Sequence, residues 1–264
     1  MSAELLVQAT ALVRETGAWI QEQQALLETL AIEDKGLNQL VSRVDREAET
    51  RLVKGLGALL PAAGFITEEA TIAQQQEQEY TWIIDPLDGT TNFLHGLPMF
   101  SISVALCRGK DPVLAIVEVP PLGETFTAVR GSGAWLNGQP IRVSGRDSLS
   151  SSLLATGFPY TEFAQLQAYL NVLHGFMKGT RGLRRMGSAA IDLSYTACGR
   201  FDGFFETGLA PWDVAAGILL VEEAGGAVSD FHGKPDMLFG KEIIAGNPRI
   251  HQSMLQAIQQ HFPS

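Results

Sequence analysis

Two aspartates three residues apart are the most informative feature of the sequence. An apolar run ends at Asp85, Pro86 forces a bend because proline cannot extend a strand ladder, and Asp88 follows. Two carboxylates on one tight bend can face a common point, as hard, oxygen-preferring cations such as Mg²⁺ require. Gly89 and Thr90 then offer backbone N–H groups to a phosphate beside the metal. Asp, Pro and Gly are also ordinary turn formers, so a plain surface turn is the competing interpretation.

Two further acidic positions favour the metal interpretation. The pair Glu68-Glu69 follows another apolar run, and Asp213 opens a predicted helix, where a simple N-cap is the competing explanation. Together, Glu68, Asp85, Asp88 and Asp213 would place a formal charge of about −4 in one pocket, which is unfavourable unless two or more Mg²⁺ ions neutralise it. The sequence therefore predicts a centre with more than one metal ion.

Other catalytic devices are missing from the sequence. It contains no GxxxxGK[ST], HExxH or GxSxG pattern and no GxGxxG after a strand. The five histidines are scattered, and His95 near the acidic bend is expected to be a surface or supporting residue. Water activated by metal is therefore the chemistry that the residues favour.

The elements that would position these acids differ between the two parts of the chain. Apolar residues at helical spacing predict helices over 5–20 and from Asp45 to Pro61, with a polar loop around residues 33–36 between them. From residue 80 the pattern predicts strands over 80–84, 101–106, 113–119 and 125–129, and a hairpin of 135–136 and 141–143 around Asn137-Gly138. Helices followed by strands with short turns indicate an α+β half with an antiparallel sheet.

Strands and helices alternate in the second part. Strands are predicted over 153–156, 201–206, 227–229 and 243–245, and helices over 188–197 and 213–224, each closed by glycine. The serine-rich stretch 144–152 marks the expected boundary. Residues 1–146 then form an N-terminal α+β half with most of the predicted metal ligands, and residues 147–264 an α/β half with Asp213 and the substrate contacts. No linker is loose enough to separate them, so one compact unit is expected.

Composition narrows the class of protein. The 264 residues include 19 Lys plus Arg against 29 Asp plus Glu, a formal charge of −10, and 45% are hydrophobic. This acidity argues against a nucleic-acid partner. Two separated cysteines exclude a disulfide framework and a zinc finger. No apolar run approaches the ~20 residues of a membrane span and the first residues lack a basic leader, so a cytoplasmic protein without a membrane partner is expected.

Three separated motifs resemble the inositol monophosphatase family of Mg²⁺-dependent, lithium-sensitive phosphatases. They are the Glu68-Glu69 pair, WIIDPLDGTTNF over residues 82–93 and PWDVAAG over residues 211–217. Matches at 40–45, 187–190, 204–206 and 225–226 extend the resemblance over nearly the whole chain. It implies a layered αβαβα sugar-phosphatase fold and a cytoplasmic, homodimeric phosphoric monoester hydrolase with two or three Mg²⁺ ions per active site.

The resemblance also implies the metal ligands. Glu68, Asp85 and the Leu87 carbonyl would hold the first Mg²⁺, while Asp85, Asp88 and Asp213 would hold the second. Glu68 would help to bind a third, more labile ion. Thr67 stands where many members of the family have glycine. This departure should not disturb a side-chain ligand at the next position.

Catalytic and substrate-binding roles follow from the same resemblance. Thr90, with Asp45 behind it, would orient the attacking water and help to deprotonate it, and Glu68 completes the expected catalytic set. Lys35 falls on the family's flexible early loop. The expected substrate contacts divide between the phosphate and the polyol part of the substrate: Asp88, Gly89, Thr90, Gly187, Ser188, Ala189 and Glu206.

Three alternatives compete with hydrolysis of myo-inositol monophosphate. Acyl-phosphate enzymes place their two aspartates two residues apart, a spacing that Asp85 and Asp88 do not match. The same fold could act on fructose 1,6-bisphosphate, a 3′-phosphoadenosine nucleotide or histidinol phosphate, but Glu206 favours a neutral polyol because it would repel a second anion. A protein that binds transcription machinery is the non-enzymatic alternative. The basic segment 181–185 fits it, although a solvated loop or a dimer interface is the preferred explanation there.

Overall fold

A seven-stranded sheet forms the first half of the chain in the computed structural model, which describes residues 3–29, 34–75, 78–159, 163 and 165–262, without the side chains of 27–29 and 34–42. Its strands lie in chain order, and β1 is parallel to β2 while all other neighbours are antiparallel. They are β1 (Gly64–Thr67), β2 (Tyr80–Asp88), β3 (Ser101–Arg108), β4 (Asp111–Val119), β5 (Glu124–Val129), β6 (Gly133–Leu136) and β7 (Gln139–Pro140).

A five-stranded mixed sheet forms the second half, in the order β11-β12-β10-β8-β9. The central strand β10 is parallel to β8, which is parallel to β9, whereas β12 is antiparallel to both β10 and β11. The strands are β8 (Leu153–Thr156), β9 (Gly182–Arg184), β10 (Gly203–Thr207), β11 (Ala227–Ser229) and β12 (Glu242–Gly246).

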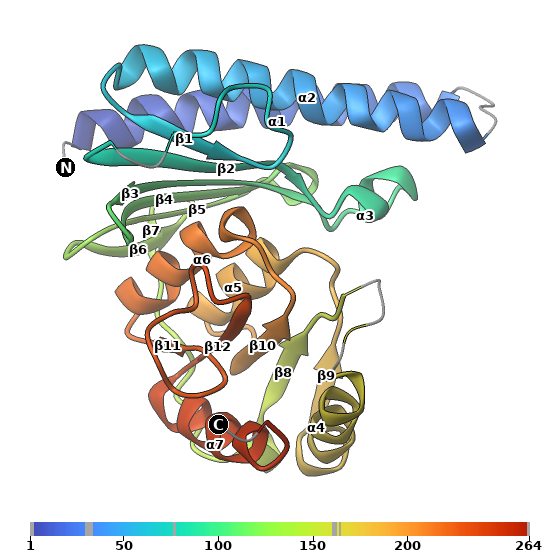
Figure 1. Cartoon of the computed structure of the whole chain (residues 1–264), viewed down its shortest axis with the longest axis vertical. Helices are drawn as coiled ribbons and strands as arrows, with labels where there is room; N and C mark the ends of the chain where they lie inside the picture. The colour runs from blue at the N-terminus through green and yellow to red at the C-terminus, as the bar shows by residue number, and fades with distance from the viewer. Residues whose placement is uncertain (1–2, 30–33, 76–77, 160–162, 164, 263–264) are drawn as a thin grey trace.

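The helices complete a five-layered αβαβα arrangement (Figure 1). Helices α1 (Ala3–Thr29) and α2 (Asp34–Leu59) cover the outer face of the first sheet, and α4 (Leu166–Gly179) and α7 (Pro248–Gln259) lie on the far side of the second. Helices α5 (Ala189–Ala197) and α6 (Pro211–Glu223) lie between the sheets. A short helix, α3 (Thr90–Leu94), follows β2, and a 3₁₀ helix (Pro120–Leu122) follows β4. A second 3₁₀ helix (Leu149–Ser151) lies within the serine-rich segment. The layered fold predicted from the sequence is confirmed.

The two central helices are buried on nearly all sides because a sheet covers each flank. Every residue of α5 is buried, as is a continuous run of α6 from Val214 to Val221. They share one hydrophobic cluster with Val117 and Phe126 of the first sheet and Phe204 of the second. A helix with no side that faces solvent is stable only when other elements cover it, as the two sheets do here. The elements that position the site are thus embedded in the core.

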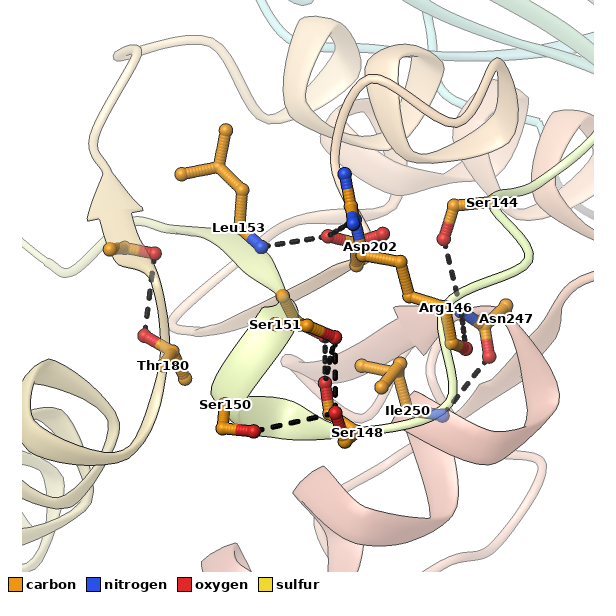
Figure 2. Close-up of polar contacts among 12 residues, drawn as sticks. Ser144, Arg146, Ser148, Ser150, Ser151, Leu153, Thr180, Asp202, Asn247 and Ile250 are labelled. Carbon is orange, nitrogen blue, oxygen red and sulfur yellow. Dashed lines mark hydrogen bonds and ion pairs between the residues drawn. The ribbon is translucent and has the colours of Figure 1, made fainter.

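The serine-rich segment 144–152 is fastened to the second half (Figure 2). Asn247 donates its side-chain amide to Ser144 Oγ at 3.1 Å and to the Arg146 carbonyl at 3.1 Å. The Arg146 guanidinium lies 3.3 Å from the Asp202 carboxylate, which also accepts the Leu153 N–H at 2.7 Å. The expected boundary therefore falls in a segment held by hydrogen bonds, and the division at residues 146 and 147 stays a prediction.

Helix α2 corrects the sequence-based boundaries at the start of the chain. The predicted loop around 33–36 is wrong for residues 34–36, since the helix begins at Asp34 and not at Asp45; residue 33 lies outside the described residues. The sequence explains why: apolar residues at 37, 40, 41 and 44 continue the helical spacing upstream. Lys35 is therefore helical, and its side chain is outside the described part of the structure.

Two strand boundaries also differ from the prediction. Strand β2 does not end at Asp85 but continues through Pro86 to Asp88, with a register shift against β3 that accommodates the proline. The hairpin turn is confirmed, with positive φ angles of 50° at Asn137 and 77° at Gly138. Its return strand is β7 at 139–140, however, and not 141–143. No helix in the described ranges has the length and apolar character to cross a membrane.

Candidate active site

The end of strand β2 forms a tight, internally bonded bend. Asp85 is only 2% exposed, and its Oδ1 accepts the Leu87 N–H at 3.0 Å. The Thr90 hydroxyl donates to the Leu87 carbonyl at 3.0 Å. Gly89 has a φ of +92°, and a Cβ there would lie 2.8 Å from the Met99 carbonyl oxygen, so only glycine fits without strain. The bend that the proline predicted therefore has one defined conformation.

Asp88 connects this bend to the second half of the chain. Its Oδ2 accepts the Ser188 hydroxyl at 2.7 Å and the Ala190 N–H at 2.8 Å. Ser188 also caps α5, because its Oγ accepts the Ile191 N–H at 3.2 Å. The carboxylate of Asp88 thus lies at the N-terminus of α5, where the helix dipole favours negative charge.

Asp213 approaches from the start of α6. The sequence suggested that it could be the N-cap; that role is wrong, because Ala210 is the cap and Asp213 is the third helical residue. Its Oδ2 accepts the Ala210 N–H at 2.7 Å. The proline at the first helical position explains the shift, since Pro is favoured there and moves the helix start upstream of the aspartate.

Glu68 reaches the same region from the neighbouring strand. Strands β1 and β2 are parallel, so their carboxyl ends lie at one edge of the sheet, and the Glu68 N–H donates to the Ile84 carbonyl at 3.3 Å. Glu68 and Asp85 lie close enough for the carboxyl group of each to shift the pKa of the other.

Burial and mutual repulsion raise the pKa values of all four acids. Burial is the larger cause in each case, and it raises the pKa of Glu68 to about 7, of Asp88 to about 7 and of Asp213 to about 6. The pKa of Asp85 lies well above its usual range because Glu68, Asp88 and Asp213 add to the effect of burial. Hydrogen bonds from Ser188 and Ala190 partly oppose the rise at Asp88.

These acids fit divalent metal ions by their chemistry. Carboxylate oxygens are hard ligands, which dications such as Mg²⁺ prefer. Acids that retain protons near neutral pH can release them when a dication binds. Among the described residues, however, no three His, Cys, Asp or Glu side chains are already arranged as a metal cage. The acids thus form a cluster of mutually repelling groups and not a finished coordination sphere.

Asp45 adds a buried acid to this edge. It lies on α2, is 6% exposed, and its Oδ1 has no hydrogen-bond partner within the described residues. Burial, followed by the charges of Glu69, Glu68 and Glu49, raises its pKa to about 8. The hydrogen bond that the structure gives Thr90 runs to the Leu87 carbonyl, so the pairing of Thr90 with Asp45 stays a prediction.

A cavity of about 300 Å³ opens beside the bend. Asp88 and Asp213 line it, whereas Glu68 and Asp85 lie outside its lining. All residues that the family resemblance assigned to the substrate line this cavity: Asp88, Gly89, Thr90, Gly187, Ser188, Ala189 and Glu206. Its remaining wall consists of residues that the sequence did not single out as substrate contacts: Thr91, Gly157, Phe158, Pro159, Arg185, Asp192, Thr207, Gly208 and Leu209.

Glu206 lies near the end of β10 and lines the cavity. Its side chain is packed against Gly157 so closely that a Cβ at that glycine would collide with the carboxylate. Burial raises the pKa of Glu206 to about 8, and the Arg185 guanidinium opposes this rise. Glu206 and Arg185 therefore bring a carboxyl group and a guanidinium group to the wall of the cavity.

Glu49 is a functional candidate that the sequence analysis missed. It is fully buried on α2 and accepts the Thr67 hydroxyl at 2.9 Å, the Glu69 N–H at 2.8 Å and the Thr71 N–H at 2.7 Å. These bonds fix the segment that carries Glu68, and they give the unusual Thr67 a partner. A signal existed in the sequence, because residue 49 falls on the same helical face as the apolar positions 48, 52 and 56.

Comparisons with known proteins give matches over most of the chain. A family model described as the inositol monophosphatase family matches residues 1–262. Nus factor SuhB of Pseudomonas aeruginosa is 44% identical over 255 residues, covering 95% of this chain and 94% of that protein. Inositol-1-monophosphatase of Mesorhizobium japonicum is 42% identical over 234 residues, covering 89% and 88%.

Solved structures share the whole fold. Inositol monophosphatase from Anabaena (Nostoc) sp. PCC 7120 superposes with a TM-score of 0.85 at 36% identity, covering 97% of this chain and 95% of that one. Extragenic suppressor protein suhB from Bartonella henselae gives a TM-score of 0.86 at 37% identity, covering 97% and 98%. The similarity therefore extends over both sheets and all layers.

Proposed function

The chain belongs to the inositol monophosphatase family, and from this premise we propose that it is a Mg²⁺-dependent phosphomonoesterase that hydrolyses myo-inositol monophosphate. One observation carries the proposal. Asp88 from the first half and Asp213 from the second line a single cavity together with the N-terminus of α5 and Glu206. Acids suited to dications, N–H groups suited to phosphate and an acceptor suited to hydroxyls thus meet in one place.

The metal ligands in this proposal are the acids of the β1 and β2 edge and of α6. Glu68, Asp85 and the Leu87 carbonyl would hold one Mg²⁺, and Asp85, Asp88 and Asp213 a second, with Glu68 contributing to a third. When bound, Mg²⁺ lowers the pKa of water and neutralises charge on the phosphoryl oxygens.

The protein's own groups orient the reactants. Thr90, with the buried Asp45 behind it, would orient the attacking water and help to deprotonate it. The N–H groups of Gly89 and Thr90 would bind the phosphate. Asp88, already fixed by Ser188 and Ala190, keeps its orientation throughout.

The leaving alcohol would occupy the end of the cavity near Glu206, with Gly187, Ser188 and Ala189 as further contacts. A carboxylate there can accept hydroxyl hydrogen bonds and repels a second phosphate, which favours a neutral polyol over fructose 1,6-bisphosphate or a 3′-phosphoadenosine nucleotide. Histidinol phosphate is a further alternative.

A phosphate-release panel with and without Mg²⁺ tests the proposal. Its substrates are myo-inositol monophosphate, fructose 1,6-bisphosphate, a 3′-phosphoadenosine nucleotide and histidinol phosphate. Release without Mg²⁺, or a clear preference for a bisphosphate, would contradict it.

A second candidate role rests on the relatives named Nus factor SuhB, such as the 43% identical protein of Escherichia coli. This chain would then also bind transcription machinery, through the arginines of the segment 181–185. Arg181 and Arg184 are exposed, and β9 is an edge strand of the second sheet. Asp85→Asn should abolish turnover and spare such binding, while charge reversal at Arg181 and Arg184 should do the opposite.

We also propose that the protein is a cytoplasmic homodimer. Light scattering measures the oligomeric state.

A further inference from the structure

Asp192 is a buried acid that neither the fold nor the proposed mechanism uses. It lies in the first turns of α5 and is only 1% exposed. Its backbone is satisfied within the helix, with its N–H donating to the Ser188 carbonyl at 3.0 Å and its carbonyl accepting the Thr196 hydroxyl at 2.8 Å. Its carboxylate Oδ1, in contrast, has no hydrogen-bond partner in the described part of the chain. Buried carboxylate oxygens are nearly always paired, so this one needs an explanation.

The location of Asp192 supplies that explanation. The residue lines the cavity together with Glu206 and Arg185, whereas Glu68 and Asp85 do not line it. The charges that act on its carboxylate are those of Glu206, Asp88 and Arg185, all of which also line the cavity. An unpaired acceptor at the wall of a ligand cavity is suited to a donor that the ligand brings.

The two buried acids at the cavity wall define the ligand chemistry. Asp192 and Glu206 line the cavity with one guanidinium, Arg185, and burial raises the pKa of both acids, so the pair favours a ligand that brings hydroxyl groups and no further negative charge. Hydroxyl groups can donate to both carboxylates without adding charge. Neighbouring hydroxyls on a ring, held by two acceptors from different elements (α5 and β10), would also be fixed in orientation.

We propose that Asp192 is a specificity-determining residue, which accepts a hydrogen bond from a hydroxyl of the leaving alcohol beside Glu206. The inference rests on the proposed phosphomonoesterase function and adds to it a residue that recognises the hydroxyl groups of the alcohol. Asp192 takes no part in the transfer of the phosphoryl group. It contributes binding of the alcohol in the ground state and the transition state alike.

The test compares two substrates in Asp192→Asn, which keeps the size of the side chain. For inositol 1-phosphate we expect kcat/KM to fall about tenfold, through KM, with kcat nearly unchanged. For p-nitrophenyl phosphate, whose leaving group has no further hydroxyl, kcat/KM should stay within about twofold. The matched control is Ser194→Ala on the same helix. Ser194 is also fully buried with an unpartnered oxygen but does not line the cavity, so neither substrate should be affected.

Each other outcome has a distinct meaning. Equal losses on both substrates, or no loss on either, would overturn the role of Asp192. If the wild-type protein releases no phosphate from either substrate with Mg²⁺, the proposed function itself fails, and this is seen before any variant is compared. Circular dichroism melting shows whether Asp192→Asn folds. If it does not, Asp192→Ser removes the carboxylate with a smaller side chain and is measured in the same way.

Discussion

The Ser188 hydroxyl donates to Asp88 Oδ2 at 2.7 Å, although the two residues are 100 positions apart in the chain. The same hydroxyl oxygen caps α5 by accepting the Ile191 N–H. One side chain therefore sets both the start of a core helix and the orientation of a proposed metal ligand. Stability and activity should respond together when it is changed.

Removal of this hydroxyl should affect both properties. Ser188→Ala deletes the cap, at a cost of about 1 kcal/mol, which corresponds to a fall in Tm of ~2–4 °C for a protein of this size. Because Asp88 keeps only the Ala190 N–H as a donor, we expect kcat/KM to fall about tenfold as well. Urea unfolding and phosphate release measure the two effects.

A second capping residue provides the control. Asn247 caps α7 by accepting the Arg249 and Ile250 N–H groups, and it does not line the cavity. Asn247→Ala should lower Tm by a comparable amount and leave kcat/KM unchanged. Equal activity losses in both variants would mean that the Ser188–Asp88 bond has no special role.

Neutralising one acid of the site should lower activity and stabilise the metal-free protein. Asp213→Asn removes a negative charge that repels Asp85, Asp88 and Glu68, while the amide oxygen can still accept the Ala210 N–H. We expect turnover to fall at least about 100-fold and Tm without Mg²⁺ to rise at pH values above the Asp213 pKa of about 6.

Asp147 is the matched control for this change, since its side chain is 70% exposed. Asp147→Asn should alter neither turnover nor the metal-free Tm. A metal-free Asp213→Asn protein less stable than the wild type would show that mutual repulsion is not the dominant interaction at this site.

The stability of the metal-free protein should decrease as pH rises. The pKa of Asp45 is raised by burial from 3.8 to about 8, and that of Glu68 from 4.5 to about 7. The folded state therefore holds protons that the unfolded state has lost, and the contribution of these groups is complete below about pH 4 and disappears as pH passes through the folded pKa values. Thermal melts from pH 4.5 to 8 in a chelator, with Mg²⁺ addition as the comparison, measure this. A metal-free Tm that rises over the range contradicts the assignment.

Glu49 should influence metal affinity from outside the coordination shell. Its carboxylate holds Thr67, Glu69 and Thr71 around Glu68. Glu49→Gln replaces one of the two acceptor oxygens by an NH₂ group, which cannot accept the N–H group that this oxygen binds. We expect Mg²⁺ affinity, measured by calorimetry, to fall ~10–100-fold. Glu47→Gln on the same helix, an exposed partner of Arg51, should have no effect.

The sequence predicted the elements whose signals are local. Proline after an apolar run marked the bend at Asp85, Ser188 with Gly199 marked the limits of α5, and Asn137-Gly138 marked the hairpin. The start of α2 was missed because Lys35-Gly36 reads as a loop although apolar spacing resumes immediately after it. The course of β2 was missed because a bulge that tolerates proline depends on pairing with β3.

The site was predictable only in part for a similar reason. Carboxylates at strand ends and in family motifs were identified, and the resemblance gave their proposed roles. Glu49 and Asp192 were not, because an acid within a helix usually marks a solvated face. Glu49 is covered by the loop after β1, and Asp192 lies at the cavity wall beside β10. Both covering elements are distant in the chain from the residue that they cover. Local pattern does not contain that information.

The cavity wall is divided between rigid and replaceable parts. The start of α5 belongs to the hydrophobic cluster between the two sheets, while residues 157–159 and 207–209 line the cavity at the ends of β8 and β10. An engineer, or natural drift, could therefore exchange these two short margins to accept a different alcohol without dismantling the machinery that cleaves the phosphate ester. Such an arrangement allows different alcohols to be accepted while the reaction stays the same.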